Sequence, residues 1–209
     1  MKHFLFAFDK RFWIAAACFL LSVALLVVMA FDNGYPLVYS DTGTYIAYGF
    51  TSEVPVDRPI MYAFFVRHIS MSFSLWLVVI AQAIIVKTVI VIACRYFLNT
   101  ANYMLYSFLI IVGLVACTGI AFYTSQLMPD IFSGIMILGL CLLFVVKKLS
   151  KAVVIFLAVL VVFSNMSHSS NLLTSTMVVV SVVLTTFIFR KKNYIQLKRI
   201  YFSIALITV

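Results

Sequence analysis

The sequence predicts an all-α polytopic membrane protein, with residues 1–209 forming a single transmembrane domain. The chain is 65% hydrophobic and only 10% charged, a composition that one soluble core could not use. Its apolar residues form long uninterrupted runs, and its Lys and Arg residues collect in alternate connections between these runs. These observations together favour helices that cross a lipid bilayer repeatedly.

Six apolar runs predict complete transmembrane helices, because about 20 helical residues cross the hydrocarbon core of a bilayer. They cover residues 12–31, 73–98, 104–123, 131–146, 152–163 and 172–189. The fourth and fifth are short and are expected to borrow flanking residues. A seventh run begins near residue 200 and is too short to cross before Val209, which predicts a truncated seventh helix.

The positive residues predict the orientation, because Lys and Arg in short loops stay on the cytoplasmic side. Twelve of the 15 agree on one topology, with a cytoplasmic N-terminus: Lys2, Lys10, Arg11, Arg95, Lys147, Lys148, Lys151, Arg190, Lys191, Lys192, Lys198 and Arg199. The predicted location is the cytoplasmic (inner) membrane. The basic residues are scattered over four loops without a single basic face, so the expected partner is the lipid bilayer and no nucleic acid.

The first outer loop, residues 32–72, is the only long one and predicts two short interfacial helices. Ser40 or Asp41 can cap a helix that runs through Tyr45. A second helix is expected after Pro59, apolar on one face, ending near Arg67 and lying along the membrane surface. Outer loops on a rigid scaffold are typical places for function.

The stretch YSDTGTYI, residues 39–46, contains the letters of an aspartic protease loop. That chemistry needs two carboxylates that share a proton, usually from two such loops, and the chain offers one. Asp41 is therefore interpreted either as a helix cap or as a general base or metal ligand at the membrane surface.

Three further outer residues have both a functional and a structural interpretation. Arg58 could bind phosphate with its planar fork, or simply pair with the neighbouring Asp57. Asp130, at the outer start of the fourth span, could be a ligand or could interact with the helix dipole. His168, in the turn SNMSHSSN, could be a ligand or an ordinary surface residue.

This arrangement of an outer first loop with an aspartate and a second acidic residue at the outer end of the fourth span resembles the GT-C superfamily of membrane glycosyltransferases. The resemblance covers nearly the whole chain as the N-terminal module of that family. It implies transfer of a sugar from a polyprenyl-phosphate donor to an acceptor hydroxyl on the periplasmic or extracellular face.

By this resemblance Asp41 matches the first-loop acidic residue, which acts as catalytic base or metal ligand. Asp130 matches the second acidic position, where the family often has a D-x-D or E-x-D pair and this chain has Pro-Asp-Ile. Arg58 would contact the donor phosphate, and His168 would support the site. The resemblance leaves the cofactor undetermined, with a divalent cation, Mg²⁺ or Mn²⁺, as the candidate.

The alternative function is a transporter or channel subunit, or a membrane scaffold without catalysis. Lys87 lies near the middle of the second span, where an ionisable residue is costly and suggests a function, unless it snorkels to the surface. Gln82 shares that span. Against transport, the spans contain no acidic residue and few Gly or Pro breaks.

Overall fold

The structure, a computed structural model, describes residues 10–56 and 58–189. This part of the chain is all-helical, without a β-strand. The helices are α1 (Lys10–Leu26), α2 (Val28–Asp32), α3 (Thr42–Thr51), α4 (Met61–Ser70), α5 (Trp76–Leu98), α6 (Tyr103–Cys117), α7 (Ile120–Ser125), α8 (Asp130–Val145), α9 (Lys151–Ser167) and α10 (Ser169–Phe189).

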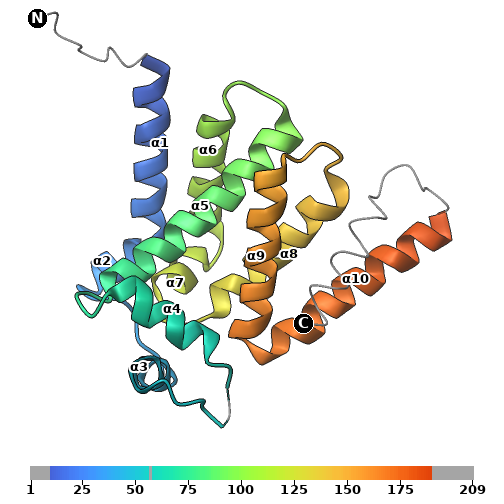
Figure 1. The fold of residues 1–209 in the computed structure, drawn as a ribbon. Helices are drawn as coiled ribbons and strands as arrows, with labels where there is room; N and C mark the ends of the chain where they lie inside the picture. Colours follow the sequence, from blue (N-terminus) through green and yellow to red (C-terminus); the bar gives the residue numbers. More distant parts are fainter. Residues whose placement is uncertain (1–9, 57, 190–209) are drawn as a thin grey trace, which may run out of the picture.

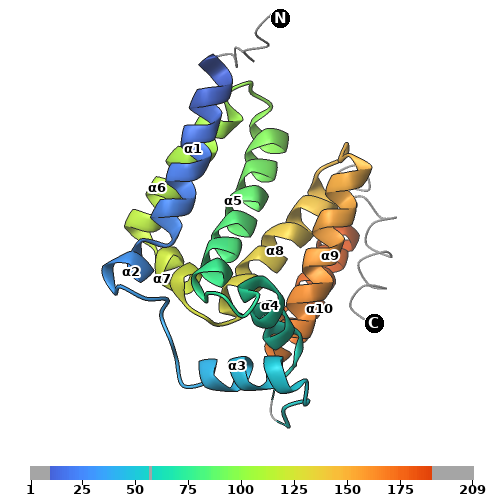
Figure 2. The same cartoon turned by 60° about the vertical axis from the view of Figure 1, so that its left-hand side comes forward.

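The longer helices form a bundle, and the short ones gather at one of its ends (Figures 1 and 2). Helix α1 packs on α5 and α6, and α8 packs on α5 and α9. Helix α10 leaves the end of α9 and contacts α8 and α9. Helices α3 and α4 pack on each other across the end where α5 and α8 begin.

The core lies where α5 and α8 face their neighbours. Val79 and Ala83 of α5, Phe132 and Leu140 of α8, and Leu157 of α9 have no exposed surface. Rings from α4, α8 and α9 interlock beside this core, with the centroids of Phe132 and Phe163 4.8 Å apart. Close packing of such apolar and aromatic groups holds the helices together whatever surrounds the bundle.

Two of the expected continuous helices are broken. The run 12–31 divides at Val27 into α1 and α2, and the run 104–123 divides at Thr118 and Gly119 into α6 and α7. At the second break Thr118 is extended, and its Oγ1 accepts a hydrogen bond from the backbone N–H of Ile120, 3.3 Å away. This side chain therefore helps α7 to begin in a new direction.

The two short helices expected in the loop 32–72 are confirmed as α3 and α4. The backbones of these helices approach closely at Gly49, where an added Cβ would lie 2.5 Å from the carbonyl oxygen of Ala63. The guanidinium of Arg67 donates to the carbonyl of Gly49 and to Ser52 Oγ, at 3.3 and 2.8 Å. These contacts join α3 and α4 into one unit.

Among the described residues, α5 is the one helix whose length and apolar composition would suffice to cross a bilayer. Helices α6, α8, α9 and α10 are apolar but have shorter apolar segments. The expected seventh helix near residue 200 lies outside the described residues.

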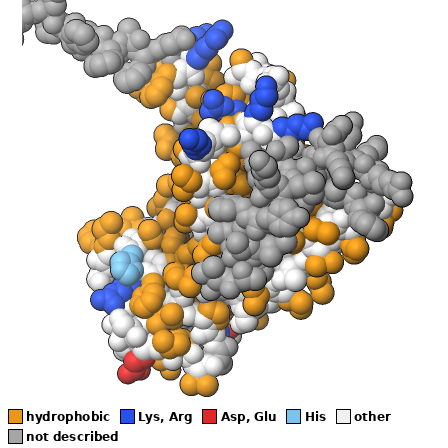
Figure 3. All heavy atoms as spheres, turned by 45° about the vertical axis from the view of Figure 1, so that its right-hand side comes forward, with side chains coloured by type: hydrophobic (Ala, Val, Ile, Leu, Met, Phe, Trp, Pro, Cys, Tyr) orange, Lys and Arg blue, Asp and Glu red, His pale blue; other side chains and the backbone are white. Residues whose placement is uncertain are grey.

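Charged side chains gather at the two ends of the bundle (Figure 3), and the end that carries the described acidic residues also carries Arg58 and Arg67. We call the end formed by α2, α3, α4 and α7 the acidic end, because it carries the four described acidic residues Asp32, Asp41, Glu53 and Asp130. We call the opposite end the basic end, because it carries Lys10, Arg11, Arg95, Lys147, Lys148 and Lys151. Between the ends, large apolar side chains cover much of the exterior.

Candidate functional site

The start of α3 is fixed to the connection between α7 and α8. Leu37 forms an isolated parallel bridge with Gln126, in which Leu37 N–H donates to the Ser125 carbonyl and Leu127 N–H to the Leu37 carbonyl, both at 2.9 Å. Thr42 Oγ1 donates to the Leu127 carbonyl at 3.2 Å. Asp41 is therefore held beside the segment that leads into α8 and Asp130.

Asp41 occupies the N-cap position of α3, but its side chain makes no capping hydrogen bond. The expectation that Ser40 or Asp41 caps this helix with its side chain is therefore wrong. The carboxylate instead forms an ion pair with Arg58, with Oδ2 2.5 Å from the guanidinium. The side chains of Arg58 and Asp41 are 20% and 34% exposed, so the pair is accessible to a ligand at the surface.

Arg58 also lies over the ring of Tyr45, with its guanidinium carbon 5.7 Å from the ring centroid. Tyr45 is buried on α3 and packs edge-to-face on Tyr62 of α4. Burial raises the pKa of the Tyr45 phenol, and the charges of Asp41 and Asp130 raise it too, whereas the charge of Arg58 and a hydrogen bond from it lower it.

Asp130 begins α8, and His168 lies between α9 and α10. His168 Nε2 is 3.9 Å from Asp130 Oδ1, at the limit of an ion pair, and both side chains are more than a third exposed. His168 Nδ1 accepts a hydrogen bond from the backbone N–H of Ser170 at 3.3 Å. The neutral imidazole therefore carries its proton on Nε2, facing Asp130.

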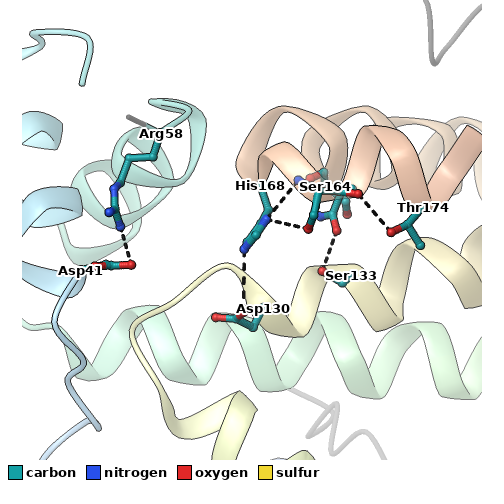
Figure 4. Close-up of polar contacts among 9 residues, drawn as sticks. Asp41, Arg58, Asp130, Ser133, Ser164, His168 and Thr174 are labelled. Atoms are coloured by element: carbon teal, nitrogen blue, oxygen red, sulfur yellow. Dashed lines mark hydrogen bonds and ion pairs between the residues drawn. The ribbon is translucent and has the colours of Figure 1, made fainter. Parts of the chain in front are cut away.

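The four residues that the sequence singled out form two pairs at the acidic end (Figure 4). Asp41 and Arg58 come from the first loop, whereas Asp130 and His168 come from α8 and the turn after α9. Tyr45 contacts the first pair, because its ring lies under the guanidinium of Arg58. The ion pair of Asp41 is with Arg58.

An apolar cavity of about 410 Å³ lies beside Asp130. It runs between α5, α6, α7 and α8, and its lining includes Val89, Ile90, Leu114, Ile135 and Asp130. Thr118 and Gly119, at the break between α6 and α7, also line it. The cavity therefore offers an apolar chain a place between helices, with a carboxylate beside it.

The described residues do not form a metal centre. No group of three or more His, Cys, Asp and Glu side chains is placed to hold an ion in this part of the chain. Asp41 is paired with a guanidinium, which disfavours a cation, and Asp130 and His168 supply two ligands between them. The residues do not fit Mg²⁺ or Mn²⁺, which prefer several oxygen ligands.

Two buried groups on α5, Gln82 and Lys87, are bound inside the bundle. Gln82 Oε1 accepts from Tyr62 Oη at 2.7 Å, and its Nε2 donates to the carbonyls of Thr124 and Gln126 at 3.0 and 2.9 Å. Lys87 has no exposed surface and donates to Ser107 Oγ at 2.8 Å, so it does not snorkel to the surface.

Asn171 is a site residue that the sequence did not single out. It is buried, accepts from Ser133 Oγ at 2.6 Å and donates to the Ser164 carbonyl at 2.8 Å. These bonds connect α8, α9 and α10 behind the Asp130–His168 pair. The signal available in the sequence was its place in the polar stretch SNMSHSSN, three residues after His168, because a buried polar side chain usually has a hydrogen-bond partner.

No protein-family model, curated protein or solved structure matches this chain.

Proposed function

We propose that this chain is a polytopic protein of the cytoplasmic membrane, with α1, α5, α6, α8, α9 and α10 crossing the bilayer and the acidic end outside. The apolar exterior supports this proposal: Leu20, Ile155, Val159 and Leu173 are each more than 60% exposed, and water would penalise such a surface. The charge separation supports the orientation, because cytoplasmic loops are rich in Lys and Arg.

The breaks in two helices are compatible with this placement. Backbone at membrane depth must be hydrogen-bonded or must lie inside the protein. Val27 is almost fully buried, and its carbonyl accepts from the N–H groups of Ala30 and Phe31. Thr118 and Gly119 are exposed, but the backbone N–H of Thr118 donates to the Leu114 carbonyl at 2.9 Å, and the backbone N–H of Ile120 donates to Thr118 Oγ1.

We further propose that the protein transfers a sugar from a polyprenyl-phosphate donor to an acceptor hydroxyl at the acidic end. The observation that carries this proposal is the Asp41–Arg58 ion pair at the surface of the same end of the bundle as Asp130, which lines the apolar cavity. Transfer from a lipid phosphate needs a base for the acceptor and a cation for the leaving group. A carboxylate next to a guanidinium supplies both, and the cavity could hold part of the polyprenyl chain.

In this mechanism the donor phosphate replaces Asp41 as the partner of Arg58, since guanidinium binds phosphate as readily as carboxylate. Asp41 then accepts the proton of the acceptor hydroxyl, and the acceptor oxygen attacks the anomeric carbon. The bond from that carbon to the phosphate oxygen breaks, and its electron pair leaves with the polyprenyl phosphate. Such a single displacement inverts the configuration of the anomeric carbon.

Asp130 and His168 act beside this step and not through a metal. The Nε2–H of neutral His168 faces Asp130, so the pair can present a carboxylate with its imidazole partner to the hydroxyls of a bound sugar. The guanidinium of Arg58 lies over the ring of Tyr45, 5.7 Å from its centroid. Asp41, Arg58, Asp130 and His168 would then position the substrates. They come from three separate segments: the first loop, α8 and the turn after α9.

The test is donor turnover by membranes that contain the full chain. Membranes are incubated with polyprenyl-phosphate mannose, glucose or aminoarabinose, and released polyprenyl phosphate is measured. Loss of a general base typically costs about 10²- to 10⁴-fold in rate, so Asp41→Asn should lose activity by that factor. Glu53→Gln, a matched change in the same exposed loop, should retain it. Turnover by Asp41→Asn equal to the wild type would refute the proposed role of Asp41.

A further inference from the structure

A second hollow, of about 670 Å³, lies at the basic end of the bundle, far from Asp41. It is formed where α5 ends, where α6 begins and where α8 connects to α9. Its lining includes Arg95, Tyr96, Asn99, Tyr103, Lys147 and Lys148. Segments more than 40 residues apart in the sequence therefore meet around one space with a strongly cationic wall.

Among the described residues, the charged side chains that line this hollow are all positive. Arg95 lies in the last turn of α5, Lys147 and Lys148 lie in the connection from α8 to α9, and all three are exposed. The four described acidic residues lie at the acidic end, so none of them neutralises this group. Three positive charges around one space create a potential that attracts anions.

The hollow is built from contacts between its walls. The guanidinium carbon of Arg95 lies 5.8 Å from the ring centroid of Tyr103, which joins α5 to α6. The backbone N–H of Ser150 donates to Tyr96 Oη at 3.4 Å, which joins the α8–α9 connection to α5. Val146 is buried and adds an apolar side chain to the lining of the hollow. These contacts fix the backbone segments that carry Arg95, Lys147 and Lys148 relative to one another.

We propose that this hollow binds the phosphate headgroup of an anionic phospholipid in the cytoplasmic leaflet. Arg and Lys bind phosphate oxygens, and the amide of Asn99 and the hydroxyl of Thr100 add hydrogen-bonding groups in the same wall. The hollow lies at the end of α5, which is the level of lipid headgroups. Basic pockets between helices on this side are typical sites for such lipids. The inference rests on the membrane placement proposed above and not on sugar transfer.

The test is lipid binding by the purified full chain in a neutral detergent. Native mass spectrometry measures the affinity for cardiolipin, with phosphatidylcholine as the zwitterionic reference and inorganic pyrophosphate as the soluble phosphate probe. The variant Lys147→Gln/Lys148→Gln removes two charges from the hollow. The control Lys10→Gln/Arg11→Gln removes two exposed charges from α1 at the same end. Thermal unfolding without lipid checks that both variants fold.

Cardiolipin should bind more tightly than phosphatidylcholine, and its affinity should fall about 25-fold in the hollow variant, from about five-fold per basic residue. The control should fall much less, because its charges lie outside the hollow. An equal loss in the control would overturn the proposal, since net charge alone would then explain binding. Pyrophosphate binding without cardiolipin binding would overturn the lipid headgroup as the ligand.

Discussion

At the scale of single residues, Arg58 determines what Asp41 can do. The guanidinium forms an ion pair with the Asp41 carboxylate and stacks over Tyr45, so its position is fixed from two sides. An adjacent cation favours the ionised form of a carboxylate, which is the form that accepts a proton. In the proposed reaction the donor phosphate binds the Arg58 guanidinium in place of Asp41. The Asp41 carboxylate then accepts the proton of the acceptor hydroxyl.

The substitution Arg58→Lys tests this exchange, because Lys keeps the charge and loses the planar fork. We expect KM for the polyprenyl-phosphate donor to rise about 10- to 100-fold, from the loss of charge-assisted hydrogen bonds worth about 1.5–3 kcal/mol. Donor turnover over a range of concentrations separates KM from kcat. An unchanged KM would show that the donor phosphate does not bind Arg58.

The buried side chain of Gln82 makes three hydrogen bonds inside the bundle. Replacing Gln82 with Leu leaves the Tyr62 hydroxyl and two backbone carbonyls without this partner, and each buried unsatisfied group costs about 1–3 kcal/mol. We therefore expect Gln82→Leu to lower the thermal unfolding temperature more than Tyr62→Phe, which removes one hydrogen bond. Equal or smaller destabilisation by Gln82→Leu would contradict this account of the network.

Of the site, the sequence could indicate the residues but not their pairing. Asp41, Arg58, Asp130 and His168 were each identified as polar groups in outer turns. Pairing with the neighbouring Asp57 was one interpretation of Arg58, and the structure shows an ion pair of Arg58 with Asp41, 17 positions earlier. Asp57 lies outside the described residues. Such pairing depends on how α3 and α4 pack, which no local pattern contains.

At the scale of elements, the pair α3–α4 forms the platform that carries the candidate site. The helix after Pro59 was predicted from local signals, a Pro in the first turn and apolar residues at helical spacing. The helix through Tyr45 was expected from a side-chain cap at Ser40 or Asp41, which the structure does not show. The breaks at Val27 and Thr118 were not predicted, because both lie in continuous apolar runs without Pro. At the second break the backbone N–H of Ile120 donates to Thr118 Oγ1.

The platform depends on Gly49. Its missing side chain lets the two backbones meet, since a Cβ there would approach the Ala63 carbonyl oxygen to 2.5 Å. We expect Gly49→Ala to separate α3 from α4 and to lower the unfolding temperature by several degrees, because overpacking typically costs about 1–3 kcal/mol.

Gly43 provides the matched control on the same helix. A Cβ at Gly43 would meet nothing within 4 Å, so Gly43→Ala should be neutral or slightly stabilising. Thermal unfolding of both variants in the same detergent makes the comparison. If both substitutions had the same effect, helix propensity and not the contact with Ala63 would explain the result.

At the scale of the whole molecule, the two ends differ in charge and in the ligand that each could bind. The acidic end carries the Asp41–Arg58 and Asp130–His168 pairs beside an apolar cavity, and the basic end carries a cationic hollow. The apolar exterior between the ends is the expected surface for lipid. A bilayer would keep the two ends in separate compartments.

Single cysteines test this placement in a background without the four native ones. Glu53→Cys marks the acidic end and Lys148→Cys marks the basic end, and both positions are exposed. In intact cells a membrane-impermeant maleimide should label Glu53→Cys at once and Lys148→Cys only after permeabilisation. Labelling of both without permeabilisation would contradict the proposed membrane placement.

The central claim is that the donor phosphate binds at Arg58, and the most direct measurement is its position in a bound structure. A cryo-electron microscopy structure of the full chain, with an antibody fragment and a non-transferable polyprenyl-phosphonate sugar, would locate it. The account predicts the phosphonate at Arg58, the lipid chain in the cavity between α5, α6, α7 and α8, and the sugar beside Asp41. A phosphonate bound in the hollow of Arg95, Lys147 and Lys148, with Asp41 still paired to Arg58, would contradict it.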